Sequence, residues 1–187
     1  MCENFEKDNI TLLAAKLERG FSKSEAAHAG GTYICYTDGS CDNLDRRRVG
    51  GASYIIIHNG EVFKKMSKSF VGTTNNRMEL LAIISAVNAC PEGSFVHVVS
   101  DSQYALNMLG MRIGHSANSD LFDLFVKCSE HVQGLSLEWV RGHSGNKWNE
   151  EADRLAYEAY CAKCRELGIE ARESLTFATH QSRRRSP

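Results

Sequence analysis

The chain has 187 residues with nearly balanced charge, 22 Lys and Arg against 23 Asp and Glu, for a formal net charge of −1. This length suits one well-buried domain with extensions and excludes two domains of ordinary size. The hydrophobic fraction of 42% is that of a globular protein, and no apolar run approaches the roughly 20 residues of a membrane-spanning helix. The balance excludes a chain that is basic throughout, so a polyanion would have to meet local clusters such as Arg46–Arg48.

The cysteines and the N-terminus indicate the compartment. Seven cysteines are an odd number, and they are scattered over predicted strands and helices, which is typical of reduced thiols. Residues 1–8 contain acids and lack the apolar stretch of a secretory signal. We therefore expect a cytoplasmic protein without a membrane partner.

Two extensions are predicted to flank the main domain. Residues 1–31 contain a short helical segment and a Gly30-Gly31 linker, and they are too few to bury a core of their own. Residues 169–187 show little apolar periodicity, so we expect a largely disordered tail.

The elements between these extensions alternate as in an α/β domain, which we place at residues 32–168. In chain order they are strands at 33–37, 51–58 and 62–71, a helix at 75–90, a strand at 95–100, helices at 102–109 and 118–132, a strand at 135–140 and a helix at 148–167. The dipeptide Asn59-Gly60 is a strong hairpin signal, so the second and third strands should be antiparallel. The order predicts a mixed five-stranded sheet with helices on both faces.

Four acids, each inside a short polar motif, are the candidate catalytic residues. They are Asp38 in Tyr-Thr-Asp-Gly-Ser, Glu79 in Asn-Asn-Arg-Met-Glu-Leu, Asp101 in Ser-Asp-Ser-Gln-Tyr and Asp153 in Asn-Glu-Glu-Ala-Asp-Arg. Asp38 and Asp101 are expected at the C-terminal ends of two strands, and such ends face one crevice if the strands are adjacent and parallel. Clustered carboxylates repel one another unless divalent cations lie among them, and two cations about 4 Å apart can cut a phosphodiester. Taken singly, each acid could instead be a turn, cap or helix-surface residue.

The motifs in this order resemble those of ribonuclease HI, the enzyme family that cuts the RNA strand of RNA/DNA hybrids. The matching strings are residues 36–41, 73–80, 100–104, 139–145 and 149–156. The resemblance implies an RNase H-like fold and a metal-dependent endoribonuclease that leaves 5′-phosphate and 3′-hydroxyl ends. It also implies the RNA/DNA hybrid as partner, and we expect a monomer.

The resemblance further implies roles for individual residues. Asp38 would bridge two Mg²⁺ ions, with Mn²⁺ as a substitute, and Glu79, Asp101 and Asp153 would complete the metal shells. His143, in Arg-Gly-His-Ser-Gly, would assist proton transfer or product departure. The implied substrate contacts are Gly39, Ser40, Cys41 and Asn43 on the RNA strand, the amides of Asn75, Asn76 and Gln103 on minor-groove edges and ribose hydroxyls, and Thr74 with Asn118 on a phosphate of the DNA strand.

The chain departs from the family pattern in three places. The segment 42–48, which ends in three arginines, replaces a Gly-Asn-Pro-Gly-like turn and could offer other phosphate contacts. The interval from Asp101 to His143 is too short for the basic protrusion of many bacterial relatives, and Gly72 stands where relatives carry Arg. Two alternatives stay open: a hybrid-binding module that has lost catalysis, and another nuclease of the same fold that acts on a different duplex.

Overall fold

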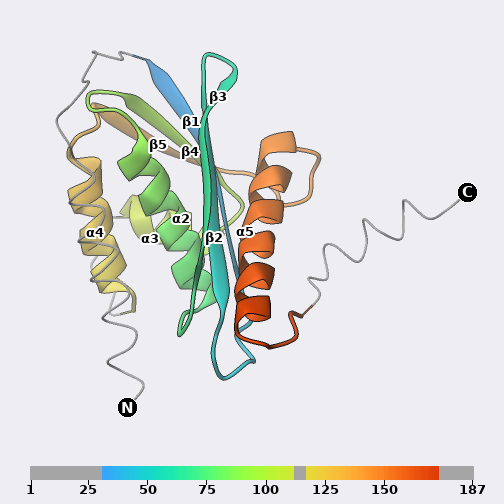
Figure 1. Ribbon diagram of the computed structural model, residues 1–187. Coiled ribbons are helices and arrows are strands. Elements are labelled where there is room, and N and C mark those ends of the chain that lie inside the picture. Colours follow the sequence, from blue (N-terminus) through green and yellow to red (C-terminus); the bar gives the residue numbers. More distant parts are fainter. Residues whose placement is uncertain (1–30, 112–116, 173–187) are drawn as a thin grey trace, which may run out of the picture.

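The computed structural model describes residues 31–111 and 117–172, which form one five-stranded sheet with helices on both faces (Figure 1). The strands are β1 (Thr32–Cys41), β2 (Gly50–His58), β3 (Glu61–Phe70), β4 (Phe95–Ser100) and β5 (Gly134–Trp139), in the spatial order β3-β2-β1-β4-β5. β1 pairs antiparallel with β2 and parallel with β4, β2 pairs antiparallel with β3, and β4 pairs parallel with β5. The predicted mixed sheet is therefore confirmed.

The helices divide unequally between the two faces of the sheet. They are α2 (Asn75–Ala89), α3 (Gln103–Met111), α4 (Ser119–Ser129) and α5 (Lys147–Glu166). Figure 1 shows α2, α3 and α4 on one side of the sheet and α5 alone on the other. Among the described residues, no helix combines the length and the apolar character needed to cross a membrane. The predicted segment 1–30, most of the loop expected at 110–117 and the tail beyond residue 172 lie outside the described residues.

The Asn59-Gly60 turn joins β2 and β3 as predicted. Asn59 has a φ of 51° and Gly60 a φ of 82°. Two consecutive positive φ angles are typical of a turn whose twist matches that of the flanking strands, and Asn followed by Gly adopts them at little cost.

Most element boundaries differ from the prediction by one or two residues, and two differ by more. The first strand was expected to end at Thr37 but continues to Cys41, because residues 38–41 pair with residues 50–53 of β2. The helix expected at 118–132 is α4, which ends at Ser129 instead of Val132. Beyond it the backbone turns to bond the segment before β4, since Gly93 N–H donates to the carbonyl of His131 (2.8 Å) and Gln133 N–H to that of Ser94 (2.9 Å). Both differences arise from pairing partners that are distant in the sequence.

The main core lies between the sheet and α2. This helix is buried on nearly all sides because it also contacts α3 and α4, and it contributes a continuous set of apolar side chains: Met78, Leu80, Leu81, Ala82, Ile83, Ile84, Ala86 and Val87. A second cluster under α5 joins Ile55 and Ile57 of β2 to Ala152. A Cβ atom on Gly51 would lie 2.1 Å from the Ala156 carbonyl oxygen, so glycine is what allows α5 to approach β2.

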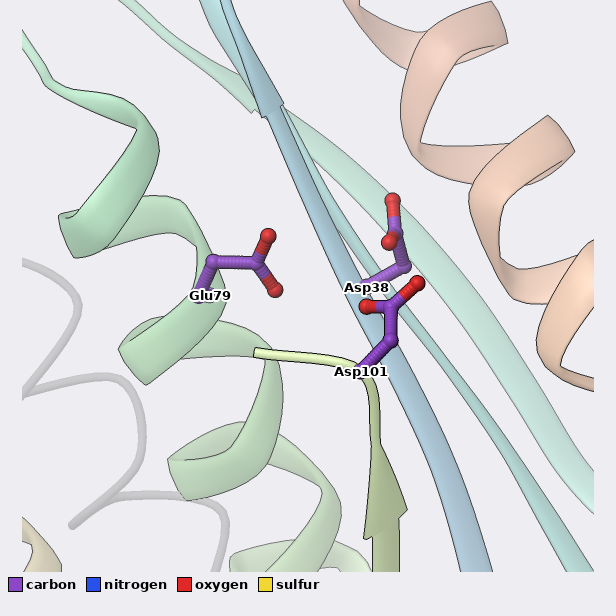
Figure 2. A group of neighbouring side chains, drawn as sticks. All are labelled: Asp38, Glu79 and Asp101. Carbon is purple, nitrogen blue, oxygen red and sulfur yellow. The ribbon is translucent and has the colours of Figure 1, made fainter. Parts of the chain in front are cut away.

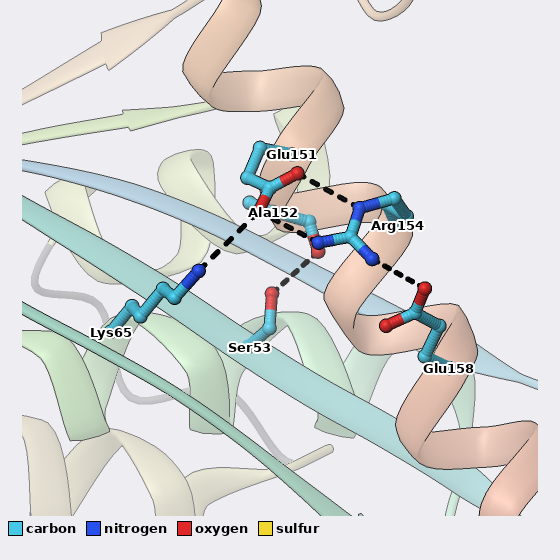
Figure 3. Close-up of polar contacts among 6 residues, drawn as sticks. All are labelled: Ser53, Lys65, Glu151, Ala152, Arg154 and Glu158. Carbon is cyan, nitrogen blue, oxygen red and sulfur yellow. Dashed lines mark hydrogen bonds and ion pairs between the residues drawn. The ribbon is translucent and has the colours of Figure 1, made fainter.

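Polar contacts also fix α5 on the sheet (Figure 3). The buried Ser53 hydroxyl donates to the carbonyl of Ala152 at 2.6 Å. Lys65 of β3 lies 3.7 Å from Glu151, which pairs in turn with Arg154, and Arg154 also pairs with Glu158. Exposed ion pairs stabilise a fold by less than about 1 kcal/mol each, so the main consequence is position. These contacts set the position of α5 on the sheet, and with it the position of Asp153.

The first residues of the expected tail pack on α5. Ile169 and Ala171 contact the small cluster around Val49, Tyr160 and Cys164. The Arg172 amide donates to the Tyr160 hydroxyl at 2.8 Å, so residues up to 172 are fixed against the helix.

Candidate metal centre and nucleic-acid site

Three of the four predicted acids converge where the parallel pair β1 and β4 ends (Figure 2). Asp38, Glu79 and Asp101 each offer a carboxylate oxygen, and these oxygens lie within 4.8 Å of one another. The parallel register ends at the pair Tyr36 and Val99, so Asp38 and Asp101 follow it by two residues each. Glu79 lies one turn into α2 and points toward the two aspartates. Adjacent parallel strands thus bring together carboxylates that are far apart in the sequence.

Gly39 allows β1 and α2 to meet at this cluster. A Cβ atom at this position would lie 2.3 Å from the backbone nitrogen of Glu79, a distance that real Cβ atoms do not reach. Because the obstacle is backbone, it could not move aside without shifting α2. The Gly39 backbone amide also hydrogen bonds within the cluster, which partly opposes the rise that burial causes in the pKa of Asp38 and of Glu79.

Burial and mutual repulsion nevertheless raise the pKa of both buried acids. For Asp38 the first cause of the raised pKa is loss of solvent, followed by the charges of Glu79, Asp153 and Asp101. For Glu79 it is again loss of solvent, followed by the charge of Asp101. The side chains are only 6% and 7% exposed, so water cannot screen these charges well.

The protein supplies no cation to this cluster within its described part. No described Lys or Arg forms an ion pair with Asp38, Glu79 or Asp101, and Glu79 Oε2 is buried without a hydrogen-bond partner there. Hard divalent cations prefer oxygen ligands of this kind, and their charge would relieve both the repulsion and the unpaired oxygen. The three carboxylates therefore fit a divalent-cation site.

Asp153 and His143 lie beside the cluster, outside its tight group. Asp153, on α5, is near enough for its charge to raise the pKa of Asp38 and Glu79. His143 Nδ1 lies 3.9 Å from Asp153 Oδ2, and the imidazole is 41% exposed. The His143 backbone has a φ of 52°, an unusual value for a non-glycine residue that indicates a local constraint.

Asp101 is oriented by residues that were not predicted as part of the site. Asn149, only 2% exposed, donates from Nδ2 to Asp101 Oδ2 at 3.3 Å, and Trp139 Nε1 donates to the Asp101 carbonyl at 3.0 Å. A Cβ on Gly142 would lie 2.6 Å from Asp101 Oδ2, so this glycine leaves room for the carboxylate. A signal for Asn149 was present, since it precedes Asp153 by four residues and hence shares its helix face.

Several predicted substrate contacts form a hydrogen-bonded chain that ends at Glu79. Asn75 Oδ1 accepts from the Cys41 amide at 3.1 Å, and Asn75 Nδ2 donates to Glu79 Oε1 at 3.5 Å. Asn43 Oδ1 accepts from the Asn75 amide at 3.2 Å. The Asn75 side chain is thus engaged inside the protein, where it fixes the β1 end to α2. Ser40, next in the chain to Cys41, is half-buried beside it.

A second group of predicted contacts is tied together by Arg77. Thr74 caps α2 by accepting from the Arg77 amide at 3.3 Å. Arg77 Nη1 donates to Asn118 Oδ1 at 2.9 Å, and the guanidinium also pairs with Asp120 at 2.6 Å. Arg77 was not predicted as a site residue, although it lies inside the recognised motif.

The two remaining predicted contacts, Asn76 and Gln103, have exposed side chains at the starts of α2 and α3. Exposed amides near a cation site can donate and accept hydrogen bonds to a ligand.

Fold and site together define an α/β protein with a divalent-cation site at the end of its parallel strands. The family model for RNase H matches residues 31–160. Ribonuclease H from Pseudoalteromonas atlantica is 37% identical over 140 residues, covering 68% of this chain and 90% of that protein. Ribonuclease H from Syntrophus aciditrophicus is 36% identical, covering 67% and 79%. Ribonuclease H from Clostridium botulinum is 32% identical, covering 67% and 93%. The chain belongs to the RNase H family, as its motifs predicted.

Proposed function

We propose that this protein is a ribonuclease H, an endoribonuclease that hydrolyses the RNA strand of RNA/DNA hybrids and leaves 5′-phosphate and 3′-hydroxyl ends. Family membership supports the activity, because the relatives described above are named Ribonuclease H. The single observation that carries the proposal is the acid cluster, whose three carboxylate oxygens lie within 4.8 Å of one another without a cation from the described protein. A protein that only bound nucleic acid would gain nothing from this repulsion toward a polyanion.

In the proposed site, Asp38, Glu79, Asp101 and Asp153 hold two Mg²⁺ ions, for which Mn²⁺ can substitute because both are hard cations. Such ions, when bound, neutralise charge on the scissile phosphate and increase the acidity of bound water. Asn149 and Gly142 keep the Asp101 carboxylate in one orientation, by hydrogen bond and by the space left for it. The fixed geometry of these ligands avoids reorganisation during the reaction.

His143 is the proposed proton carrier. Its imidazole is exposed and lies 3.9 Å from Asp153, so it can exchange protons with solvent beside the acid cluster. Imidazole is a common general acid or base in catalysis, which suits this task.

Recognition of the hybrid is proposed to rest on groups around the cluster. Asn76 and Gln103 have exposed amides for base edges and ribose hydroxyls, and Thr74 with Asn118 would hold a DNA-strand phosphate. The backbone around Gly39, Ser40 and Cys41, with Asn43, would meet the RNA strand. Asn75 would act through the loop that it fixes, since both ends of its amide are already bonded.

We further propose a cytoplasmic monomer. The reduced state expected there suits the free thiols of the described part, namely Cys35, Cys41, Cys90, Cys128, Cys161 and Cys164. Light scattering coupled to gel filtration would check the oligomeric state.

The deciding experiment is cleavage of an end-labelled RNA/DNA hybrid in Mg²⁺, Mn²⁺ or EDTA, beside RNA/RNA, DNA/DNA and single-stranded RNA of the same sequence. We expect metal-dependent cutting of RNA in the hybrid alone. Hybrid that is bound but uncut would indicate a binding module without catalysis. Cutting of another duplex instead would indicate a nuclease of the same fold with a different substrate.

A further inference from the structure

The loop between β1 and β2, residues 42–49, carries three consecutive arginines, Arg46, Arg47 and Arg48, all with exposed side chains. We propose that Arg46 and Arg48 grip the phosphate backbone of the bound duplex next to the acid cluster, while Arg47 anchors the loop. This inference rests on the proposed function, because it assigns the nucleic-acid substrate as the occupant of the loop.

The loop is fixed to the rim of the acid cluster by backbone hydrogen bonds. The Arg47 carbonyl accepts from the Gly72 amide at 2.9 Å, and the Arg48 carbonyl accepts from the Thr73 amide at 3.1 Å. Gly72 and Thr73 lead directly into the cap of α2, the helix that carries Glu79. The arginines therefore hold a defined position relative to the cluster.

The loop also lies within reach of a duplex bound at the cluster. Asp38 is four residues from the loop's first residue, Asp42, along an extended strand, which corresponds to about 13 Å. A nucleic-acid strand advances about 3.4 Å along its axis per nucleotide, so this is the length of roughly four base pairs. A duplex with its scissile phosphate at Asp38 would extend this far on either side.

The guanidinium groups of Arg46 and Arg48 are not neutralised by other described residues. Arg46 and Arg48 form no ion pair or side-chain hydrogen bond with a described residue, whereas Arg47 Nη1 donates to the Leu167 carbonyl at 3.1 Å. The loop's own acids are occupied. Asp45 Oδ1 accepts from the Arg47 amide at 2.7 Å, and Asp42 pairs with Arg172 at 3.3 Å.

Several other described cationic residues form ion pairs within the protein. Arg77 pairs with Asp120, Arg154 with two glutamates, Lys65 with Glu151 and Lys163 with Glu166. Arg46 and Arg48 lie two residues apart and have no such partner among the described residues, so a phosphate backbone can supply their counter-charge.

The backbone conformation of Arg48 is strained, which costs the free protein some stability. Arg48 has a φ of 44°, in the left-handed region that a residue with a Cβ adopts at a cost of about 1 kcal/mol. A glycine or asparagine would relieve that strain. With arginine at this position, the strained backbone still holds its carbonyl against the Thr73 amide, one residue before the cap of α2.

Guanidinium groups are suited to phosphate because their planar fork donates two parallel hydrogen bonds and keeps its charge at any physiological pH. Contacts of this kind read no base sequence, and each one releases condensed counterions when it forms. The salt dependence of binding therefore tests the proposal, because its slope is proportional to the number of phosphate contacts.

The test measures binding of the full-length protein to a fluorescein-labelled 20-base-pair RNA/DNA hybrid in EDTA, as a function of NaCl concentration. We compare the wild type with the double variant Arg46→Gln/Arg48→Gln, which keeps side-chain length and removes both charges. The slope of log Kd against log salt should fall by about 0.9 for each lost contact, hence by nearly two in the double variant. The affinity for DNA/DNA of equal length should fall by a similar factor.

Two further variants make the result decisive. Arg46→Lys/Arg48→Lys, which restores both charges, should recover most of the slope. Lys64→Gln removes an exposed charge near the opposite, Asn59-Gly60 end of the sheet and should leave the slope unchanged. An unchanged slope in the double glutamine variant, or an equal fall in Lys64→Gln, would overturn the proposal.

The two proposals fail separately. If the wild type cuts the hybrid and the salt slope is the same without the charges of Arg46 and Arg48, only the proposed phosphate contacts of these arginines are contradicted. If the wild type cuts no hybrid, the proposed function is contradicted. If the wild type also binds no hybrid at low salt, the proposed phosphate contacts are contradicted as well.

Discussion

Acids in two regions of this molecule have pKa values shifted in opposite directions. On α4 and α5, Asp120 is hydrogen bonded by Arg77 and Glu151 by Arg154, and these bonds are the main reason that the pKa of each acid is lowered. At the end of β1 and within α2, Asp38 and Glu79 are buried among other acids, and the pKa of each is raised.

The difference shows that a shortage of cations does not explain the unpaired cluster. The chain has 22 Lys and Arg, and it places arginines opposite acids on neighbouring elements. It supplies none to Asp38, Glu79 or Asp101 among the described residues. The stability lost by burying unpaired acids is the expected consequence of a site built for a cation from solution.

The largest expected effect on cleavage comes from neutralising an acid of the cluster, and an acid of α5 serves as the control. Asp101→Asn should reduce hybrid cleavage on the order of a thousandfold, because losing a metal ligand costs several kcal/mol of transition-state stabilisation. Glu158→Gln, which removes an acid paired with Arg154 on α5, should leave the rate within about twofold. Single-turnover cleavage in Mg²⁺ measures both variants, and circular dichroism checks that each is folded. Wild-type cleavage by Asp101→Asn would refute the assignment of the cluster.

A smaller effect is expected at Asn149, which contacts Asp101 without being one of the acids. Asn149→Leu keeps the buried volume but removes the hydrogen bond to Asp101 Oδ2. Loss of a partner that orients a metal ligand typically weakens metal affinity 10- to 100-fold, so the Mg²⁺ concentration for half-maximal cleavage should rise by roughly that factor.

The matched control for this position is Asn107→Leu, at an exposed site on α3. It should leave the Mg²⁺ requirement unchanged. If Asn149→Leu lowered only the melting temperature while the Mg²⁺ requirement stayed at the wild-type value, Asn149 would be a packing residue and not a positioning residue.

Local signals in the sequence predicted most of the fold. Asn59-Gly60 located the hairpin because its two positive φ angles depend on those two residues alone. The strand over 95–100 was predicted with its observed bounds, since its apolar run is flanked by turn residues. The extent of β1 beyond Thr37 and the end of α4 depend on hydrogen bonds to residues distant in the sequence, which local periodicity does not report.

The site was predictable to a similar degree. Motif order indicated the four acids, and parallel pairing of β1 with β4 explains why three of them meet. The motifs did not reveal that Asn75 bonds inward to Glu79, or that Gly142 and Asn149 frame Asp101. These facts depend on distances between separate elements, and only the folded chain fixes such distances.

The smallest effect concerns how stability depends on pH, and it compares the two regions most directly. Asp38 has an ordinary pKa of 3.8 that folding raises, so its contribution to stability is fully present below 3.8 and is lost as the pH rises through the folded-state pKa. Glu151 has an ordinary pKa of 4.5 that folding lowers, so its contribution is present above 4.5 and is lost as the pH falls through the folded-state pKa.

Urea unfolding in EDTA between pH 4 and pH 8 should therefore give opposite signs for two variants. Relative to the wild type, Asp38→Asn should be more stable at pH 7, and its advantage should shrink toward pH 4. Glu151→Gln should be less stable at pH 7 by at most about 1 kcal/mol, because its ion pairs with Arg154 and Lys65 are partly exposed. If Asp38→Asn were destabilised at pH 7 to the same extent as Glu151→Gln, the Asp38 charge would already be compensated within the protein, and the contrast between the two regions would not hold.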